Sequence, residues 1–239
     1  MKQKNVLLAV GAHPDDLEFT SSGTIARMVD EGWDAYYLLC TDGSRGSKDP
    51  KMTHKRLAQI RRKEQVKAGK ILGLKDIFFL NHTDTELVTD MTLKGEIVRI
   101  IRTVRPKIVF GWDPTFYYTE HSAWTDTAFI NHTDHRAAGI ATMDAVFPLS
   151  RDMLTFPEQL KEGLSAHRVE ELWLYGAEKK AHVVNITSTF DKKIKALEVH
   201  ASQFDDFPAI KKRVVNRALN FAEEEEFEFA ESFIRLILP

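Results

Sequence analysis

The chain has 239 residues, of which 43% are hydrophobic and 28% are charged, and its formal net charge is −2. These values are typical of a globular protein with a substantial core, and they exclude the strongly basic surface that binds nucleic acid. The single cysteine, Cys40, excludes an internal disulfide, and no apolar run approaches the roughly 20 residues of a membrane span. We therefore expect a cytoplasmic protein with neither a nucleic-acid partner nor a membrane span.

Apolar runs and helical patterns alternate along the chain. Short runs of aliphatic and aromatic residues predict buried strands, and longer segments with apolar residues three and four apart predict helices between them. The expected strands are residues 5–10, 35–40, 76–80, 107–111, 171–175 and 181–186, and the expected helices are residues 20–31, 53–72, 90–104, 134–147 and 190–202. This alternation predicts an α/β fold, a Rossmann-like three-layer sandwich with a mainly parallel sheet, with residues 1–239 as a single domain.

The first expected strand runs into a cluster of ionisable side chains, His13-Pro14-Asp15-Asp16. Ligands of open α/β sheets bind beyond the carboxyl ends of the strands, where this cluster should lie. Holding an imidazole and two carboxylates so close together is costly without a cation or a reaction to serve. The cluster is therefore a candidate metal site. No Gly-x-Gly-x-x-Gly follows the strand, so a dinucleotide is not indicated.

A second cluster, His132-Thr133-Asp134-His135, offers the remaining ligands. The His-x-x-His spacing places two imidazoles about one helical turn apart on one face. With His13 and Asp16, this segment can complete a set of two histidines and one carboxylate. Three protein ligands with an open position are typical of a catalytic zinc site.

On these residues the chain resembles the N-acetylglucosaminylphosphatidylinositol de-N-acetylase (PIG-L) family, the LmbE-like zinc deacetylases. The first motif stands here as Ala12-His13-Pro14-Asp15-Asp16-Leu17-Glu18 and the second as His132-Thr133-Asp134-His135. The likeness continues in Leu39-Cys40-Thr41-Asp42-Gly43, Arg61-Arg62-Lys63-Glu64, Asp84 and His200-Ala201-Ser202-Gln203, and covers most of residues 4–205. Leu17 before Glu18, and Thr133 in place of the usual proline, are departures that remove no proposed ligand.

The resemblance implies a role for each matching residue. His13, Asp16 and His135 would bind Zn²⁺ or another divalent transition metal, and a bound Zn²⁺ can lower the pKa of water to about 7. Asp15 would be the general base, His132 would stabilise the oxyanion or protonate the leaving amine, and Asp134 would orient an imidazole. Arg61 and Asp84 would contact the sugar, and His200 would lie near the pocket rim. The implied activity is removal of the acetyl group from an N-acetylglucosamine-type sugar or conjugate by a homo-oligomer, a trimer or hexamer.

Two other functions fit part of the pattern. His13-x-Asp15 with a distant histidine also fits the facial triad of a non-haem iron(II) oxygenase, although the α/β alternation disfavours it. A binding module that has kept its metal would not need Asp15.

Residues 112–131 are rich in aromatic side chains and are expected to shape the substrate pocket or to form an oligomer contact. The sequence does not identify the aglycone.

Overall fold

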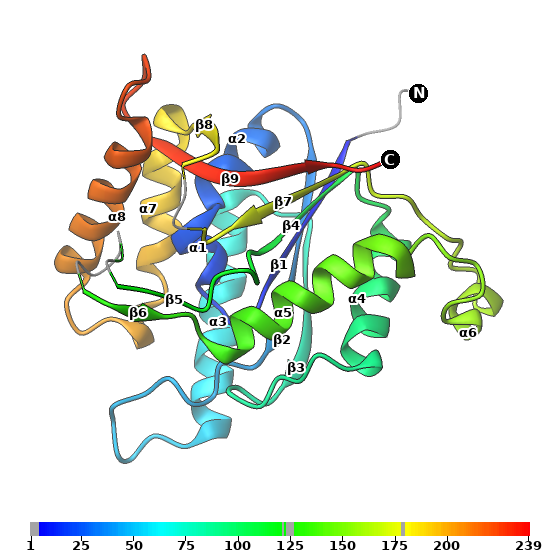
Figure 1. Cartoon of the computed structure of the whole chain (residues 1–239). Helices are drawn as coiled ribbons and strands as arrows, with labels where there is room; N and C mark the ends of the chain where they lie inside the picture. The colour runs from blue at the N-terminus through cyan, green and yellow to red at the C-terminus, as the bar shows by residue number, and fades with distance from the viewer. Residues whose placement is uncertain (1–4, 121, 123–126, 178–179) are drawn as a thin grey trace.

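The computed structural model describes residues 5–120, 122, 127–177 and 180–239. Within this part of the chain, a seven-stranded sheet in the order β3-β2-β1-β4-β7-β9-β8 forms the centre of the molecule (Figure 1). The first five strands of this order are parallel, and β9 runs antiparallel to both of its neighbours. The strands are β1 (Val6–Gly11), β2 (Asp34–Thr41), β3 (Asp76–His82), β4 (Ile108–Trp112), β7 (Glu171–Tyr175), β8 (His182–Asn185) and β9 (Ala230–Ile237), with a separate antiparallel pair of β5 (Tyr118–Thr119) and β6 (Phe129–Ile130).

Helices cover the sheet in two groups whose members pack against one another (Figure 1). The first group comprises α1 (Asp16–Thr20), α2 (Ser22–Asp30), α3 (His54–Leu72) and α7 (Phe190–Glu198), and the second comprises α4 (Met91–Val104) and α5 (Thr133–Asp144). A π-helical turn, Ala145–Leu149, continues α5, while α6 (Pro157–Lys161) follows it and α8 (Phe207–Ala222) contacts β9. Among the described residues, no helix is both long and apolar enough to cross a membrane. The predicted three-layer α/β fold with a mainly parallel sheet is confirmed.

All of the predicted strands are present, but the sequence analysis missed β9 and α8. Charged residues interrupt the apolar pattern of β9, and each is accommodated by a partner distant in sequence. Glu231 is buried against Lys193, at 2.8 Å, and Arg235 pairs with Glu171 at 2.7 Å. The pattern of β9 alone therefore did not reveal a strand that lies inside the sheet.

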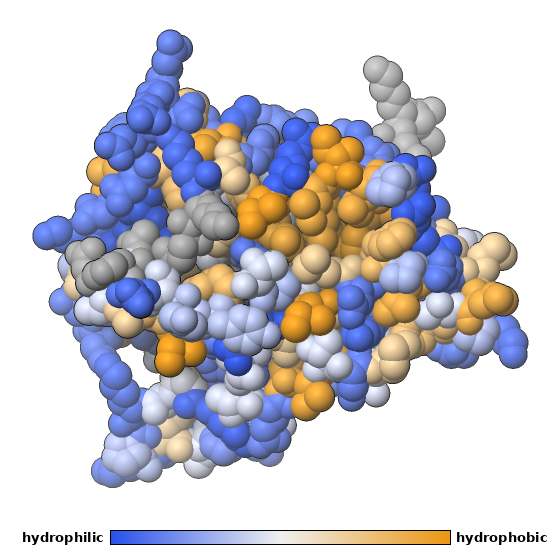
Figure 2. Space-filling view, in the orientation of Figure 1, coloured by the Kyte–Doolittle hydropathy of each residue, from blue (hydrophilic) through white to orange (hydrophobic). Residues whose placement is uncertain are grey.

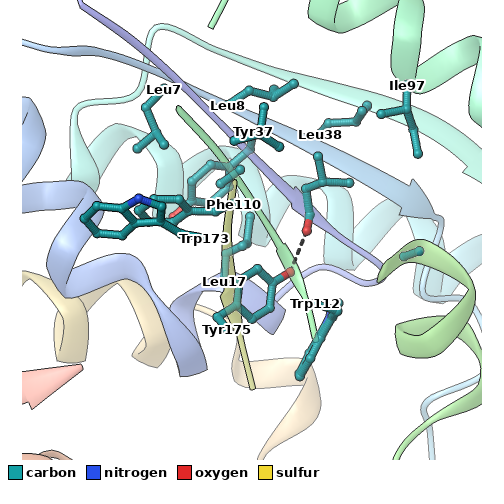
Figure 3. Packing of buried hydrophobic residues seen from close by; sticks show 14 of the residues in the cluster. Leu7, Leu8, Leu17, Tyr37, Leu38, Ile97, Phe110, Trp112, Trp173 and Tyr175 are labelled. Atoms are coloured by element: carbon teal, nitrogen blue, oxygen red, sulfur yellow. Dashed lines mark hydrogen bonds between the residues drawn. The ribbon is translucent and has the colours of Figure 1, made fainter. Parts of the chain in front are cut away.

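The apolar core lies between the sheet and its helices (Figure 3). Phe110 of β4 stacks on Trp173 of β7, with ring centroids 5.2 Å apart. The buried hydroxyl of Tyr175 donates a hydrogen bond to the backbone oxygen of Val10 at 2.5 Å. This bond joins β7 to the carboxyl end of β1, directly below the first motif, and so contributes to fixing the floor of the site.

The strand order reverses direction in sequence between β1 and β4, because β2 and β3 lie on one side of β1 while β4 lies on the other. Such a switch point opens a crevice at the carboxyl ends of the strands. The segments that follow β1, β3 and β4 begin with His13, Asp84 and Asp113 close behind the strand ends. The fold thus brings the first motif to the edge where a ligand would bind, and His13 contacts Asp134 of the second motif there at 3.1 Å.

Candidate metal and catalytic site

Asp16 is fixed by hydrogen bonds to one of its two carboxylate oxygens. Oδ2 accepts from the backbone N–H groups of Ala12 and His13, both at 2.8 Å, and from the indole N–H of Trp112 at 3.1 Å. Oδ1 lies 3.7 Å from Nδ1 of His13 and 3.3 Å from Nε2 of His135. The histidines outweigh the effect of burial, which alone would raise the pKa of Asp16, and hold that pKa well below its ordinary value. Asp16 is therefore an ionised carboxylate with one oxygen directed at two imidazoles.

The start of α5 orients the second pair of histidines. His135 lies with Nδ1 3.2 Å from the amide oxygen of Asn131, and Trp112 stacks on its ring with centroids 3.9 Å apart. Since an amide oxygen only accepts, Nδ1 carries the proton and Nε2 presents a lone pair toward Asp16. His132 instead accepts from the backbone N–H of Asp134 through Nδ1 at 3.1 Å. Its Nε2 therefore carries the proton, and burial with two neighbouring imidazoles lowers the pKa of His132 and keeps the ring neutral.

His13 is oriented by two carboxylates behind it. Its Nε2 lies 3.1 Å from Oδ1 of Asp84 and 3.1 Å from Oδ2 of Asp134. Burial opposes protonation, but the contacts with Asp134, Asp16 and Asp84 outweigh it and raise the pKa of His13 well above its ordinary value. Nδ1, on the side of Asp16, would become a metal ligand once a bound ion displaced its proton, with Nε2 oriented by these carboxylates in the manner of a carboxylate–histidine–metal triad.

The spacing of these donor atoms fits a metal ion. Zinc bonds of about 2.0–2.1 Å at tetrahedral angles place neighbouring donors roughly 3.4 Å apart. The two separations from Asp16 Oδ1 are 3.7 and 3.3 Å. His13, His132 and His135 also present donor atoms within 4.8 Å of one another, as do His13, Asp84, His132 and Asp134. The cluster can hold a metal ion in more than one way, and His13 belongs to each of these sets.

The carboxylate of Asp15 does not cap helix α1, because the backbone of this residue has an unusual conformation. The residue is the N-cap of α1 with a left-handed φ of 92°, and its side chain makes no capping hydrogen bond. An aspartate at this position ordinarily turns back to accept from the helix. Here the carboxylate lines the cavity instead, with Oδ1 3.2 Å from Nη2 of Arg61. Burial raises the pKa of Asp15, and the Arg61 guanidinium opposes that shift.

Arg61 is bound to the chain around Asp15 as well as to its carboxylate. The guanidinium donates to the backbone oxygens of Pro14, at 2.5 Å, and Gly43, at 3.0 Å, and only 4% of the residue is exposed. Gly43 has a φ of 61°, and a Cβ there would lie 2.8 Å from the guanidinium. Arg61 reaches the edge of the cavity, but its hydrogen bonds identify it first as a partner of Asp15.

Asp84 and His200 were both predicted to bind substrate, and of the two only Asp84 lines the cavity. Asp84 contacts His13 through Oδ1 and accepts from the backbone N–H of Arg45 through Oδ2 at 2.9 Å. Against the effect of burial, the contact with His13 lowers the pKa of Asp84 to about 2. His200 is fully buried, lies 3.5 Å from Oε2 of Glu18, and is not part of the cavity wall. Its position below α1 removes His200 from direct contact with a bound molecule, which corrects the predicted place at the rim.

The cavity above this cluster has a volume of about 390 Å³. One wall carries the histidines, Asp15, Asp16 and Asp84, and the other is largely aromatic. Phe116 and Phe129, which stack with centroids 6.1 Å apart, come from the aromatic segment 112–131 that was expected to shape the pocket. Part of that segment, including Trp124, lies outside the described residues. The cavity is within the size range of small-molecule sites.

Three residues of the site carried no assignment from sequence. Trp112 binds Asp16 and stacks on His135, Asn131 orients His135, and Gln65 contacts Asp15. Spacing gave a signal for Gln65, which lies four residues after Arg61 on α3, because residues four apart on a helix share a face. Asn131 precedes the start of α5, so this spacing rule does not single it out. No pattern in the sequence singled out the contact of Trp112, which joins residues 96 positions apart.

Comparison with known proteins agrees with this geometry. The chain is 34% identical to the diacetylchitobiose deacetylase of Thermococcus kodakarensis over 200 residues, 84% of this chain and 70% of that protein. It is 29% identical to a probable N-acetyl-alpha-D-glucosaminyl L-malate deacetylase 2 of Bacillus anthracis, over 85% of this chain and 84% of that protein. The structure of N,N'-diacetylchitobiose deacetylase from Pyrococcus horikoshii superposes with a TM-score of 0.89 at 29% identity, covering 99% of this chain and 85% of that one. The family described as PIG-L: GlcNAc-PI de-N-acetylase matches residues 8–146, and the chain belongs to this family.

Proposed function

We propose that this protein is a metal-dependent hydrolase that removes the N-acetyl group from an N-acetylglucosamine-type sugar or its conjugate. One observation carries the proposal. Nδ1 of His13 and Nε2 of His135 lie 3.7 and 3.3 Å from the same oxygen, Oδ1 of Asp16. Asp15, whose carboxylate does not cap the helix, lies beside them in the cavity wall. The deacetylases among the relatives support the same reaction class.

The reaction is hydrolysis of an amide, in which water adds to the carbonyl carbon and the C–N bond breaks to give acetate and a free amine. His13, Asp16 and His135 would hold the metal ion, which as Zn²⁺ would supply a Lewis acid for the carbonyl and lower the pKa of water. Asp15 takes the proton from water as general base, since its pKa is raised by burial, and can return that proton to the amine nitrogen.

His132 has a separate role, which follows from its tautomer. Its Nδ1 accepts from the main chain and its Nε2 carries the proton. A neutral imidazole with a fixed N–H is a donor for the oxyanion that forms at the carbonyl oxygen. We therefore propose the first of the two roles that the sequence left open, stabilisation of the oxyanion. Asp134, with no exposed surface, orients His13 and does not reach the substrate.

The nitrogen and oxygen donor set fits zinc and other divalent transition metals, because affinity follows the Irving–Williams order and availability decides among them. The oxygenase alternative has no support among the relatives, which are amide hydrolases by name. A non-catalytic module would leave Asp15, held in a strained conformation at the cavity, without a purpose.

A panel of N-acetylated sugars and conjugates provides the test. Purified protein is incubated with each compound, released acetate is quantified, and the product is identified by mass spectrometry as the free amine. We expect turnover of at least one compound with an N-acetylglucosamine ring, and none of matched compounds without the acetamide. Absence of acetate release across the panel, from protein carrying its metal, would contradict the proposal.

Assembly and location complete the proposal. We propose a homo-oligomer, a trimer or hexamer, that works in the cytoplasm. Apolar side chains gather over β7 and β9 on the face seen in Figure 2, and Ile237 of β9 is among the exposed large apolar residues. Such patches mark protein contacts in many chains. The molar mass of the purified protein, measured by light scattering, tests the assembly, and a monomeric mass would contradict it.

A further inference from the structure

Gln65 joins the catalytic loop to a buried carboxylate through both ends of its amide. The residue lies on α3 with no exposed surface. Its Oε1 accepts from the backbone N–H of Asp15 at 3.1 Å, and its Nε2 donates to Oε1 of Glu18 at 2.9 Å. Since a backbone N–H only donates and a carboxylate in this contact accepts, these two partners fix the orientation of the amide.

Asp15 needs such a partner, because its main chain is strained. A φ of 92° is the left-handed region, which a residue with a Cβ enters at a cost. This conformation directs the carboxylate away from the helix N-terminus and into the cavity wall. Arg61 holds the carboxylate and the Pro14 oxygen, while Gln65, four residues on along α3, holds the Asp15 N–H. Two neighbouring side chains on one helix face thus hold both polar groups of the Pro14–Asp15 peptide, on the N-terminal side of the strained residue.

Glu18 anchors the far end of the amide. It is fully buried, and its second oxygen, Oε2, lies 3.5 Å from Nε2 of the equally buried His200. Within the described residues, neither that oxygen nor the His200 nitrogens have another hydrogen-bond partner. A contiguous series of contacts therefore runs from His200 through Glu18 and Gln65 to the Asp15 main chain. None of the three residues lines the cavity.

We propose that Gln65 is a positioning residue: its amide holds the Asp15 main chain in the left-handed conformation that presents the Asp15 carboxylate to the substrate. The proposal rests on the proposed function, in which Asp15 is the general base. It also assigns a purpose to Glu18 and His200, which support Gln65 from behind rather than contacting the sugar.

The central test is Gln65→Met, which keeps the side-chain length but loses both hydrogen bonds. We expect kcat to fall about 10- to 100-fold, the scale of a misplaced catalytic group, with KM within about twofold and an unchanged metal content. Gln159→Met is the matched control. Gln159 is another buried glutamine bound at both ends, to the Gly95 oxygen at 2.9 Å and to Arg102 at 3.4 Å, and it lies outside the cavity wall. The Gln159→Met variant should lose about as much stability as Gln65→Met and keep the wild-type kcat.

Rescue provides a second measurement. Gln65→Glu loses the donor to Glu18, whereas Gln65→Glu combined with Glu18→Gln restores a donor–acceptor pair and keeps the acceptor for the Asp15 N–H. We expect the double variant to be at least about tenfold more active than Gln65→Glu alone, consistent with recovery of a buried hydrogen bond to a charged group. No recovery in a folded, metal-bearing double variant would overturn the proposal, even if Gln65→Met did not fold.

Crystal structures separate this proposal from the proposed function. In the Gln65→Met variant the φ of Asp15 should leave the left-handed region, and in the double variant it should return there. A Gln65→Met structure in which Asp15 keeps its wild-type φ overturns the positioning role whatever the activity. If the wild-type protein released no acetate at all, the proposed function would fail, while this structural measurement would still decide the role of Gln65.

Discussion

Two clusters of buried charge lie beside helix α1, and they differ in the balance of positive and negative charge. In one cluster, Lys193 donates to the backbone oxygens of Glu18 and Phe19 and to Glu231, at 2.8–2.9 Å, which uses all three of its protons. Glu231 also accepts from the backbone N–H groups of Gly23 and Thr24 at the start of α2. This cluster pairs one positive charge with one negative charge and leaves no acceptor or donor for a ligand.

In the other cluster, carboxylates outnumber permanent cations. Asp15, Asp16, Asp84 and Asp134 gather around the histidines with Arg61 as the one arginine in the cavity wall. Nδ1 of His13 and Nε2 of His135 both face Oδ1 of Asp16, at 3.7 and 3.3 Å. An excess of buried negative charge is costly, so the cluster whose carboxylates outnumber its permanent cations is the one that implies a cation and a reaction. The comparison teaches that the balance of charge, more than burial, separates a structural cluster from a functional one.

Asp15→Asn should produce the largest effect on turnover. Loss of a general base typically lowers kcat by about 10²–10⁴-fold, and the variant should keep its metal because Asp15 Oδ1 faces Arg61 rather than the histidines. Asp16→Asn is the comparison, since it should lose metal and activity together. Metal content by mass spectrometry and kcat distinguish the two variants. An empty site in Asp15→Asn beside a full site in Asp16→Asn would exchange their roles.

Lys193→Met should act on stability instead. Removing one partner of a buried ion pair typically costs about 3–5 kcal/mol, because Glu231 would remain buried without its counterion. Urea denaturation should show the loss, while kcat per folded molecule falls far less than in Asp15→Asn. A Lys193→Met protein of wild-type stability and strongly reduced kcat would place Lys193 in the functional cluster and break the comparison.

Arg61→Ala tests the link between the guanidinium and the base. Loss of a hydrogen bond to a charged group costs about 1.5–3 kcal/mol, or roughly 10- to 150-fold in kcat/KM. Because Arg61 contacts Asp15 and the loop around it, we expect most of this loss in kcat, with metal content unchanged. Steady-state kinetics on an N-acetylglucosamine conjugate separate the effect on kcat from the effect on KM. A pure rise in KM would return Arg61 to the role of a sugar-binding residue, and unchanged kcat/KM would exclude it from the site.

The smallest effect concerns pH, at a histidine remote from both clusters. Burial lowers the pKa of His167, whose Nε2 lies 2.7 Å from the Pro106 oxygen. A folded-state pKa below the unfolded value means that protons favour the unfolded chain, so stability is complete above about pH 6.5 and falls as the pH drops below it. In denaturation curves His167→Gln should flatten this slope. Asp84 should have a separate effect at more acidic pH. Its pKa of about 2 lies below the ordinary aspartate value, so stability falls as the pH drops from that value toward 2. An unaltered slope near pH 6 in the variant would contradict the assignment.

The sequence predicted the elements that depend on local pattern and the residues that belong to a compact motif. His13, Asp15 and Asp16 were placed together because they follow one buried strand, and His132 and His135 because they share a helix face. The roles of Arg61, Asp84 and His200 needed contacts that the sequence does not encode locally. His13 and Asp134, for example, meet across 121 positions. The same limit applies to β9, whose buried Glu231 is explained only by Lys193.

The most direct test of the central claim is acetate release by protein from which all metal has been removed. The account predicts that the metal-free protein releases no acetate, that about one equivalent of Zn²⁺ per chain restores turnover, and that His13→Ala, Asp16→Asn and His135→Ala abolish the restoration. Full turnover in rigorously metal-free protein would contradict the account, because Asp15 would then be activating water without the ion that the cluster is arranged to hold.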